Sequence, residues 1–165
     1  MPQEITHAFE PVYDQASKIL ILGTMPSPKS RENGFYYGHP QNRFWPVLAE
    51  VLGGEIPRNN EEKQKFLYKH HIALWDVLYS CSIEGASDGS IRNPVPNDIA
   101  RVLKAAPIQA VFTTGKKADE LYRRYCLPQT GVQAICLPST SPANIGRFPF
   151  AELVSAYRCI LPYLN

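Results

Sequence analysis

The sequence predicts an α/β fold, a three-layer α/β/α sandwich in which a central, mostly parallel four-stranded sheet lies between helices. Four short apolar runs, at residues 18–23, 72–74, 109–115 and 132–137, are typical of buried strands. Segments with apolar residues at three- and four-residue spacing, typical of amphipathic helices, separate these runs. With 165 residues, 44% of them hydrophobic and 19% charged, the chain has the size and composition of one globular domain over residues 1–165.

The first half of the chain is expected to form one strand and two helices. The strand over residues 18–23 ends at Gly23, and a long loop without periodicity follows to Gln41. Loops of that length inside a compact domain are commonly functional. Asn42 then opens a helix that ends at Gly53, with these apolar side chains on its inner face: Phe44, Trp45, Leu48, Val51 and Leu52. A second helix is expected from Asn59 or Asn60 to about His70, with Glu62 placed as in a capping box.

The second half continues the alternation. After the strand at 72–74 we expect a turn or helix up to Cys81, and a loop from Ile83 to Pro96. Asn97 is the predicted N-cap of a helix that Pro107 terminates. The strand at 109–115 leads into a helix at about 116–125, and the strand at 132–137 precedes a final helix at about 149–162. The buried face of that helix is predicted to hold Phe150, Leu153, Val154, Tyr157 and Leu161. In such a fold the site lies at the carboxyl ends of the strands.

Composition excludes some classes of protein and leaves others open. No stretch approaches the roughly 18 apolar residues that cross a bilayer, and the first residues lack the pattern of a signal peptide, so we expect a cytoplasmic protein without membrane contact. A net charge of +2 permits DNA binding without arguing for it. The four cysteines form no C-x-x-C pair, which favours buried reduced thiols over a metal site: Cys81, Cys126, Cys136 and Cys159.

Three loops carry residues that could do chemistry. Residues 23–28 lack a glycine-rich phosphate pattern, and alone they favour a structural turn. Residues 34–45 contain Tyr36 and Tyr37, which could stack on a nucleobase or pack within the domain, and Asn42, which could be only a helix cap. Residues 137–147 place serine and threonine between prolines, a pattern suited to gripping phosphates without added charge.

In this order, the three loops resemble the motifs of the uracil-DNA glycosylase superfamily, in particular its hypoxanthine-DNA and mismatch-specific branches. Residues 23–27 resemble the first motif, and residues 39–45 (HPQNRFW) resemble the run that follows it in mismatch-specific enzymes. Residues 138–144, with Phe148 and Pro149, resemble the second motif, which enters the minor groove. Residues 72–77 and 90–98 are similar to the hypoxanthine branch, so the resemblance covers residues 18–160.

The resemblance implies a monofunctional DNA glycosylase that flips a deaminated base out of DNA and hydrolyses its N-glycosidic bond. Hypoxanthine is the first expected base and uracil the second. Asn42, through its amide oxygen, would orient the attacking water. The implied base pocket is Gly23, Thr24, Met25, Pro26, Tyr36, Tyr37 and His39, and the implied DNA-binding residues are Ser27, Ser139, Thr140, Ser141, Asn144, Ile145 and Arg147. No metal and no organic cofactor are implied, and enzymes of this type act on damaged DNA as monomers.

Two residues qualify this mechanism. Met25 stands where mismatch-specific enzymes carry an asparagine that positions water, and methionine cannot hold water by a strong hydrogen bond. The hypoxanthine branch is similar in lacking that residue and relying on the asparagine that matches Asn42. His39 could protonate a leaving purine, because histidine titrates near neutral pH. No lysine occupies a motif position, which favours simple hydrolysis over lyase chemistry.

Two alternatives belong to other functional classes. A non-catalytic protein of this fold that binds damaged DNA stays open because of Met25. An α/β protein that binds free nucleotides would do so without the steep salt dependence of duplex binding.

Overall fold

The computed structural model describes residues 3–6, 9–25, 34–83, 91–144 and 146–164. Its central sheet has the strand order β3-β2-β6-β7, and every neighbouring pair is parallel. The strands are β2 (Ile19–Gly23), β3 (Ile72–Asp76), β6 (Ala110–Thr114) and β7 (Ala134–Leu137). The predicted four-stranded parallel sheet is therefore confirmed.

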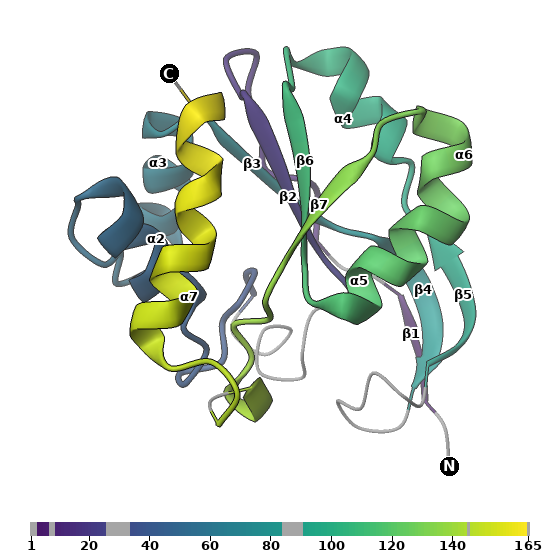
Figure 1. Ribbon diagram of the computed structural model, residues 1–165. Helices are drawn as coiled ribbons and strands as arrows, with labels where there is room; N and C mark the ends of the chain where they lie inside the picture. Colours follow the sequence, from purple (N-terminus) through teal and green to yellow (C-terminus); the bar gives the residue numbers. More distant parts are fainter. Residues whose placement is uncertain (1–2, 7–8, 26–33, 84–90, 145, 165) are drawn as a thin grey trace.

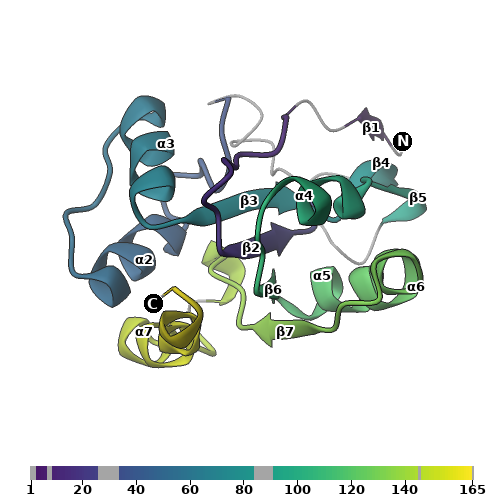
Figure 2. The same cartoon turned by 90° about the horizontal axis from the view of Figure 1, so that it is seen from above.

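Helices cover both faces of this sheet (Figures 1 and 2). They are α2 (Phe44–Leu52), α3 (Asn60–Lys69), α4 (Ile99–Ala105), α5 (Lys116–Leu121), α6 (Leu127–Thr130) and α7 (Phe150–Tyr157). A π-helical turn joins α5 to α6, and a 3-10 helix continues α7. Helices α2, α3 and α7 lie on one side of the sheet, and α4, α5 and α6 on the other. Within the described ranges, no helix has the length and apolar character needed to span a membrane.

The inner strand β2 and the edge strand β3 are both buried, because helices cover the sheet on both faces. All five residues of β2 and all five of β3 are buried. A strand that is apolar on both faces loses the alternation of a half-exposed strand, which explains the continuous apolar runs in the sequence. Phe44 and Trp45, assigned to the core from their spacing, are 0% and 3% exposed.

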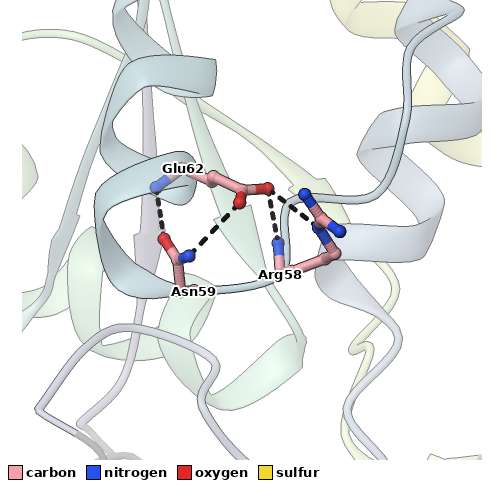
Figure 3. A network of polar contacts seen from close by, with 3 residues as sticks. All are labelled: Arg58, Asn59 and Glu62. Carbon is pink, nitrogen blue, oxygen red and sulfur yellow. Dashed lines mark hydrogen bonds and ion pairs between the residues drawn. The ribbon is translucent and has the colours of Figure 1, made fainter.

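The predicted capping box at the start of α3 is present in a slightly shifted form (Figure 3). The side chain of Asn59 accepts a hydrogen bond from the backbone N–H of Glu62 at 2.8 Å. The Glu62 carboxylate accepts in return from the backbone N–H of Arg58 at 3.2 Å, one residue earlier than in the usual box. This hydrogen bond is the largest cause that lowers the pKa of Glu62. The side-chain hydrogen bond and the charge of Arg58 lower it further.

A second, antiparallel sheet was not predicted. It has the order β1-β4-β5, formed by β1 (Gln3–Thr6), β4 (Leu78–Ile83) and β5 (Arg92–Pro96). The expectations of a turn or helix before Cys81, and of a loop up to Pro96, were therefore wrong for these strands. The prolines of β5 hid it in the sequence, but an outer strand tolerates proline because one row of its N–H groups needs no partner.

Asn97 does not cap α4. The N-cap position belongs to Asp98, which makes no side-chain capping bond. The buried Asn97 amide instead donates to the carbonyl oxygens of Asp76 and Leu78, at 2.8 and 3.1 Å. Asn97 thus fixes the point where the chain passes from the central sheet to the second sheet.

Two expectations about burial also need correction. Phe150 is 41% exposed, because it begins α7 at the rim of the core. The thiols of Cys81 and Cys126 are buried, as expected, but those of Cys136 and Cys159 are exposed.

Candidate functional site

The four parallel strands end at one edge of the central sheet, so their last residues lie side by side. Gly23, the last residue of β2, is in register with Asp76, the last residue of β3. Thr114 at the end of β6 is in register with Leu137 of β7. The described parts of the candidate loops start from or pass along this edge (Figure 1). The carboxyl edge of the sheet is therefore the candidate site.

At the centre of this edge, Gly23 occupies a place that admits no side chain. A Cβ atom on Gly23 would lie 2.5 Å from Oδ1 of Asp76 and 3.1 Å from the hydroxyl of Tyr37. Asp76 is only 4% exposed. A carboxyl group and a phenol thus pack directly against the backbone at the end of β2, and Gly23 is the residue that lets them.

Tyr37 joins the loop before α2 to the strand ends. Its hydroxyl lies 3.0 Å from the Thr114 hydroxyl, and its ring stacks on Phe44 with centroids 3.8 Å apart and planes 13° apart. Its φ of 53° is a left-handed value that only surrounding contacts can hold in a residue other than glycine. Burial, and then the nearby Asp76, raise the pKa of Tyr37 far above its usual value. The phenol is therefore neutral and can donate a hydrogen bond.

Tyr36, also predicted to line the base pocket, lies in the core. It is 2% exposed, and its hydroxyl donates to the carbonyl oxygen of Glu10 at 2.7 Å. Its ring meets those of Phe9 and Phe35 edge to face. In this conformation Tyr36 has no face open to a base, so of the two predicted tyrosines only Tyr37 is at the strand ends.

The remaining predicted pocket residues are partly described. Thr24 and Met25 follow Gly23 and are half-buried, and the Thr24 carbonyl accepts from the backbone N–H of Leu78 at 3.1 Å. His39 is half-buried, and its Nδ1 accepts from the backbone N–H of Gln41 at 3.0 Å, which leaves Nε2 as the ring nitrogen able to donate. The predicted residues Pro26, Ser27 and Ile145 lie outside the described residues.

Asn42 lies just before α2 and is half-buried. Its Oδ1 accepts two hydrogen bonds, from the backbone N–H of Phe44 at 2.9 Å and from the hydroxyl of Thr140 at 2.8 Å. The first bond lies in the turn before α2, whose N-cap position belongs to Arg43, so the predicted cap is displaced by one residue. The second ties the loop before α2 to the loop after β7. Because the oxygen expected to orient water already has two donors, the role assigned to this atom from the sequence does not fit the observed conformation.

The loop after β7 is fixed by its own polar groups. The Asn144 amide donates to the carbonyl of Ser139 at 2.9 Å, and the Ser139 hydroxyl accepts from the backbone N–H of Ser141 at 3.1 Å. Thr140, predicted to contact DNA, is only 1% exposed and points inward to Asn42. The loop therefore presents Ser139, Ser141 and Asn144, all half-buried, while Thr140 anchors it.

A cavity of about 500 Å³ lies between this loop and the ends of β6 and β7. That volume is within the roughly 300–1,000 Å³ of typical ligand pockets. Its lining residues are Thr114, Gly115, Lys116, Lys117, Cys136, Leu137, Pro138, Ser139, Asn144, Arg147 and Phe148. Three of them are cations, and three were predicted to bind DNA. The cavity shares Thr114 with the cluster around Gly23, so the two features adjoin.

Three residues of this region were not predicted from the sequence. Asp76 ends the apolar run IALW, and Thr114 ends β6, so a polar residue closing a buried strand was the available signal. The third residue is Lys116, which begins α5 and lines the cavity. No three His, Cys, Asp or Glu side chains of the described ranges are grouped to hold a metal ion.

Comparisons with known proteins point to one family. A family model described as the uracil DNA glycosylase superfamily matches residues 10–164. A hypoxanthine DNA glycosylase from Methanosarcina acetivorans is 34% identical over 142 residues, which cover 85% of this chain and 89% of the relative. A hypoxanthine DNA glycosylase from Methanosarcina barkeri is 34% identical over 138 residues, covering 82% and 86%. A solution NMR structure of a candidate uracil DNA glycosylase from M. acetivorans shares 32% identity, with a TM-score of 0.79 over 96% of this chain and 99% of that one.

Proposed function

Because the chain belongs to the uracil DNA glycosylase superfamily, we propose that it removes a deaminated base from DNA by hydrolysing the N-glycosidic bond. Hypoxanthine is the preferred base, a choice supported by two relatives that carry the name hypoxanthine DNA glycosylase. Uracil is a second substrate. The chain acts as one glycosylase domain, as a monomer in the cytoplasm, and its partner is DNA that contains a damaged base.

The observation that carries the preference is the buried carboxyl group of Asp76 beside Gly23 and Tyr37. Deamination turns adenine N1, a hydrogen-bond acceptor, into the N–H donor of hypoxanthine. An ionised carboxylate only accepts hydrogen bonds, so it favours the N–H and opposes the lone pair of adenine. A buried acceptor of this kind discriminates between the two bases, because adenine offers it a lone pair where hypoxanthine offers a donor. Uracil also presents a ring N–H between carbonyl groups.

The damaged nucleotide must leave the duplex to reach this edge of the sheet. Flipping costs a few kcal/mol, and least for a mispaired base such as hypoxanthine opposite thymine. The neighbouring cavity suits the phosphates that flank the flipped nucleotide, because Lys116, Lys117 and Arg147 line it. Ser139 and Asn144 on its wall add neutral donors. The cations and the base site are therefore adjacent, as a flipped nucleotide requires.

The reaction needs an oriented water and stabilisation of the leaving base. The bond between C1′ and the base nitrogen breaks toward an oxocarbenium-like sugar, and the electron pair leaves with the base. A cationic sugar accepts neutral water, so no strong general base is required. Asn42 is the catalytic residue of this proposal, because its carboxamide is held between the backbone N–H of Phe44 and Thr140 of the loop after β7.

The test is base release from duplex oligonucleotides with hypoxanthine, uracil or adenine at one position, followed by alkali to cleave abasic sites. The wild-type chain is expected to cut the hypoxanthine strand fastest. N42A is expected to lower the single-turnover rate about 100- to 1,000-fold, the usual effect of removing one catalytic hydrogen-bonding group. Its affinity for the same duplex should stay within a few-fold.

Two results would support the alternatives instead. Tight binding of the damaged duplex without base release by the wild-type chain would identify a non-catalytic damage-binding protein. Binding of free nucleotides that salt does not weaken, with no affinity for duplex, would identify a protein of small-molecule metabolism, because phosphate-mediated duplex binding falls steeply with salt.

A further inference from the structure

The orientation of the Asn42 carboxamide follows from its hydrogen-bond partners. The backbone N–H of Phe44 can only donate, so the amide atom 2.9 Å away must be the oxygen. The Thr140 hydroxyl donates to the same oxygen at 2.8 Å. An amide oxygen has two lone pairs, and both now face a donor.

The amide nitrogen of Asn42, Nδ2, has different surroundings. Among the residues that the structure describes, none accepts a hydrogen bond from Nδ2 of Asn42, and its side chain is half-buried at the site. The group that this side chain offers to a substrate is consequently a donor and not an acceptor.

Thr140 is itself firmly held. It is 1% exposed, and its carbonyl oxygen accepts from the backbone N–H of Arg43 at 3.2 Å. The Arg43 guanidinium donates to the carbonyl of Phe148 at the far end of the same loop. Residues 42 and 43 therefore form hydrogen bonds with the loop after β7 at two places. The Thr140 hydroxyl is the group that bonds to the side-chain amide of Asn42.

We infer that Asn42 serves the reaction as a hydrogen-bond donor through Nδ2, and that Thr140 is the positioning residue that sets this orientation. The inference rests on the proposed function. As the bond between C1′ and the base nitrogen breaks, negative charge builds on the base, and a donor stabilises it. The water oxygen forms the new bond to C1′, and one water proton ends on the base nitrogen.

N42D tests the donor directly. Aspartate keeps two oxygens that can accept from Phe44 and Thr140, but it loses the N–H of Nδ2. At saturating enzyme and neutral pH, base release from the hypoxanthine duplex should fall about 100-fold or more, as in N42A. A rate within about tenfold of the wild type would overturn the inference, because an acceptor would then suffice.

T140V and T140S form a matched pair for the positioning role. Valine keeps the shape of threonine and removes the hydroxyl, whereas serine keeps the hydroxyl and removes the methyl group. T140V should lower the single-turnover rate about tenfold, the value of one hydrogen bond, with little change in the DNA dissociation constant, and T140S should retain most of the rate. In an N42A background, T140V should cause no further loss, since residues that act as a unit are not additive.

The outcomes separate the two proposals. If the wild-type chain releases no base, the proposed function fails and this inference fails with it. If N42A abolishes release but N42D does not, only the donor assignment fails. If T140V loses rate equally in the wild-type and N42A backgrounds, Thr140 acts through general stability and the positioning role is refuted.

Discussion

At the scale of single residues, Asp76 shows how much depends on one buried acceptor. A carboxylate and a carboxamide have nearly the same shape, but only the amide can also donate. Asp76 lies against Gly23 and is buried, so water competes weakly for its oxygens. The selectivity of the site for a ring N–H should therefore follow the chemistry of this side chain more than the shape of the pocket.

D76N is expected to lower kcat/KM for hypoxanthine excision about tenfold or more, because it replaces a hydrogen bond to a charged group with a neutral one. The preference for hypoxanthine over adenine should fall as well, since the new amide can donate to adenine N1. Competition between two labelled duplexes measures the ratio. D98N removes a charge from an exposed residue and is the matched control. An unchanged ratio in D76N would assign base selection to other residues.

At the scale of elements, helices α2 and α3 begin with different hydrogen bonds at their first turns. The first backbone N–H of α2 donates to Asn42, which precedes the helix and also contacts the functional loop, whereas α3 is capped by Asn59 within its own first turn. Within the described residues, the hydrogen bonds of this cap join Arg58, Asn59 and Glu62 to one another and reach no residue of the site. A substitution at Asn59 therefore tests the stability of α3 without changing a residue of the site.

N59A is expected to destabilise the protein by about 1 kcal/mol, the usual cost of losing an asparagine cap. Thermal or urea unfolding measures the change, and base release at a temperature well below the transition should equal that of the wild type. A loss of base release without a loss of stability would contradict the assignment of Asn59 to a purely structural role.

The elements that the sequence predicted were those whose signals are local. The apolar runs of the parallel strands, the spacing within α2 and the Asn59–Glu62 pair all lie within a few residues. Strand β1 pairs with β4 across 80 positions of sequence, as Gln3 with Ile83, so no local pattern marks it. Asn97 looked like a cap because caps are the commonest use of an asparagine before a helix, and only the bend between two sheets gave it another partner.

The candidate site, like the fold, was predicted from the sequence only in part. The loops were found by composition and by resemblance, and the structure brings Asn42 to the loop after β7. The burial of Tyr36 and Thr140 was not predictable, because neighbouring positions in an irregular loop carry no periodicity that separates inward from outward side chains. Asp76 was missed because its partner Gly23 is 53 positions away in the sequence and meets it only through strand register.

At the scale of the whole molecule, the position of the charged side chains matters more than the net charge. The net charge is only +2, but Lys116, Lys117 and Arg147 share one cavity wall. Nζ of Lys117 lies 4.0 Å from Oε1 of Glu120. This ion pair is weak and partly exposed, so a phosphate could take the place of Glu120. The affinity for DNA should therefore come from one edge of the sheet, next to the base site, and not from the overall charge.

The phenol groups of three tyrosines and the thiol of Cys126 set the alkaline limit of the fold. Burial is the main cause that raises the pKa of Tyr36, Tyr37 and Tyr157 above the usual value, and it raises that of Cys126 to about 11. Above about pH 10 an unfolded tyrosine loses its proton while the folded one keeps it, so the native state binds more protons than the unfolded state. Stability is then fully present below the unfolded pKa and falls as pH rises.

We expect the free energy of unfolding to begin to fall above about pH 8.5, where an unfolded cysteine ionises, and to fall more steeply above about pH 10. Each buried tyrosine adds up to about 1.4 kcal/mol per pH unit to the slope. Urea unfolding at a series of pH values measures that slope, and Y37F should make it shallower by one such increment. A slope in Y37F equal to that of the wild type would mean that Tyr37 ionises as readily in the folded protein as in the unfolded chain, and that water reaches its hydroxyl at the end of β2.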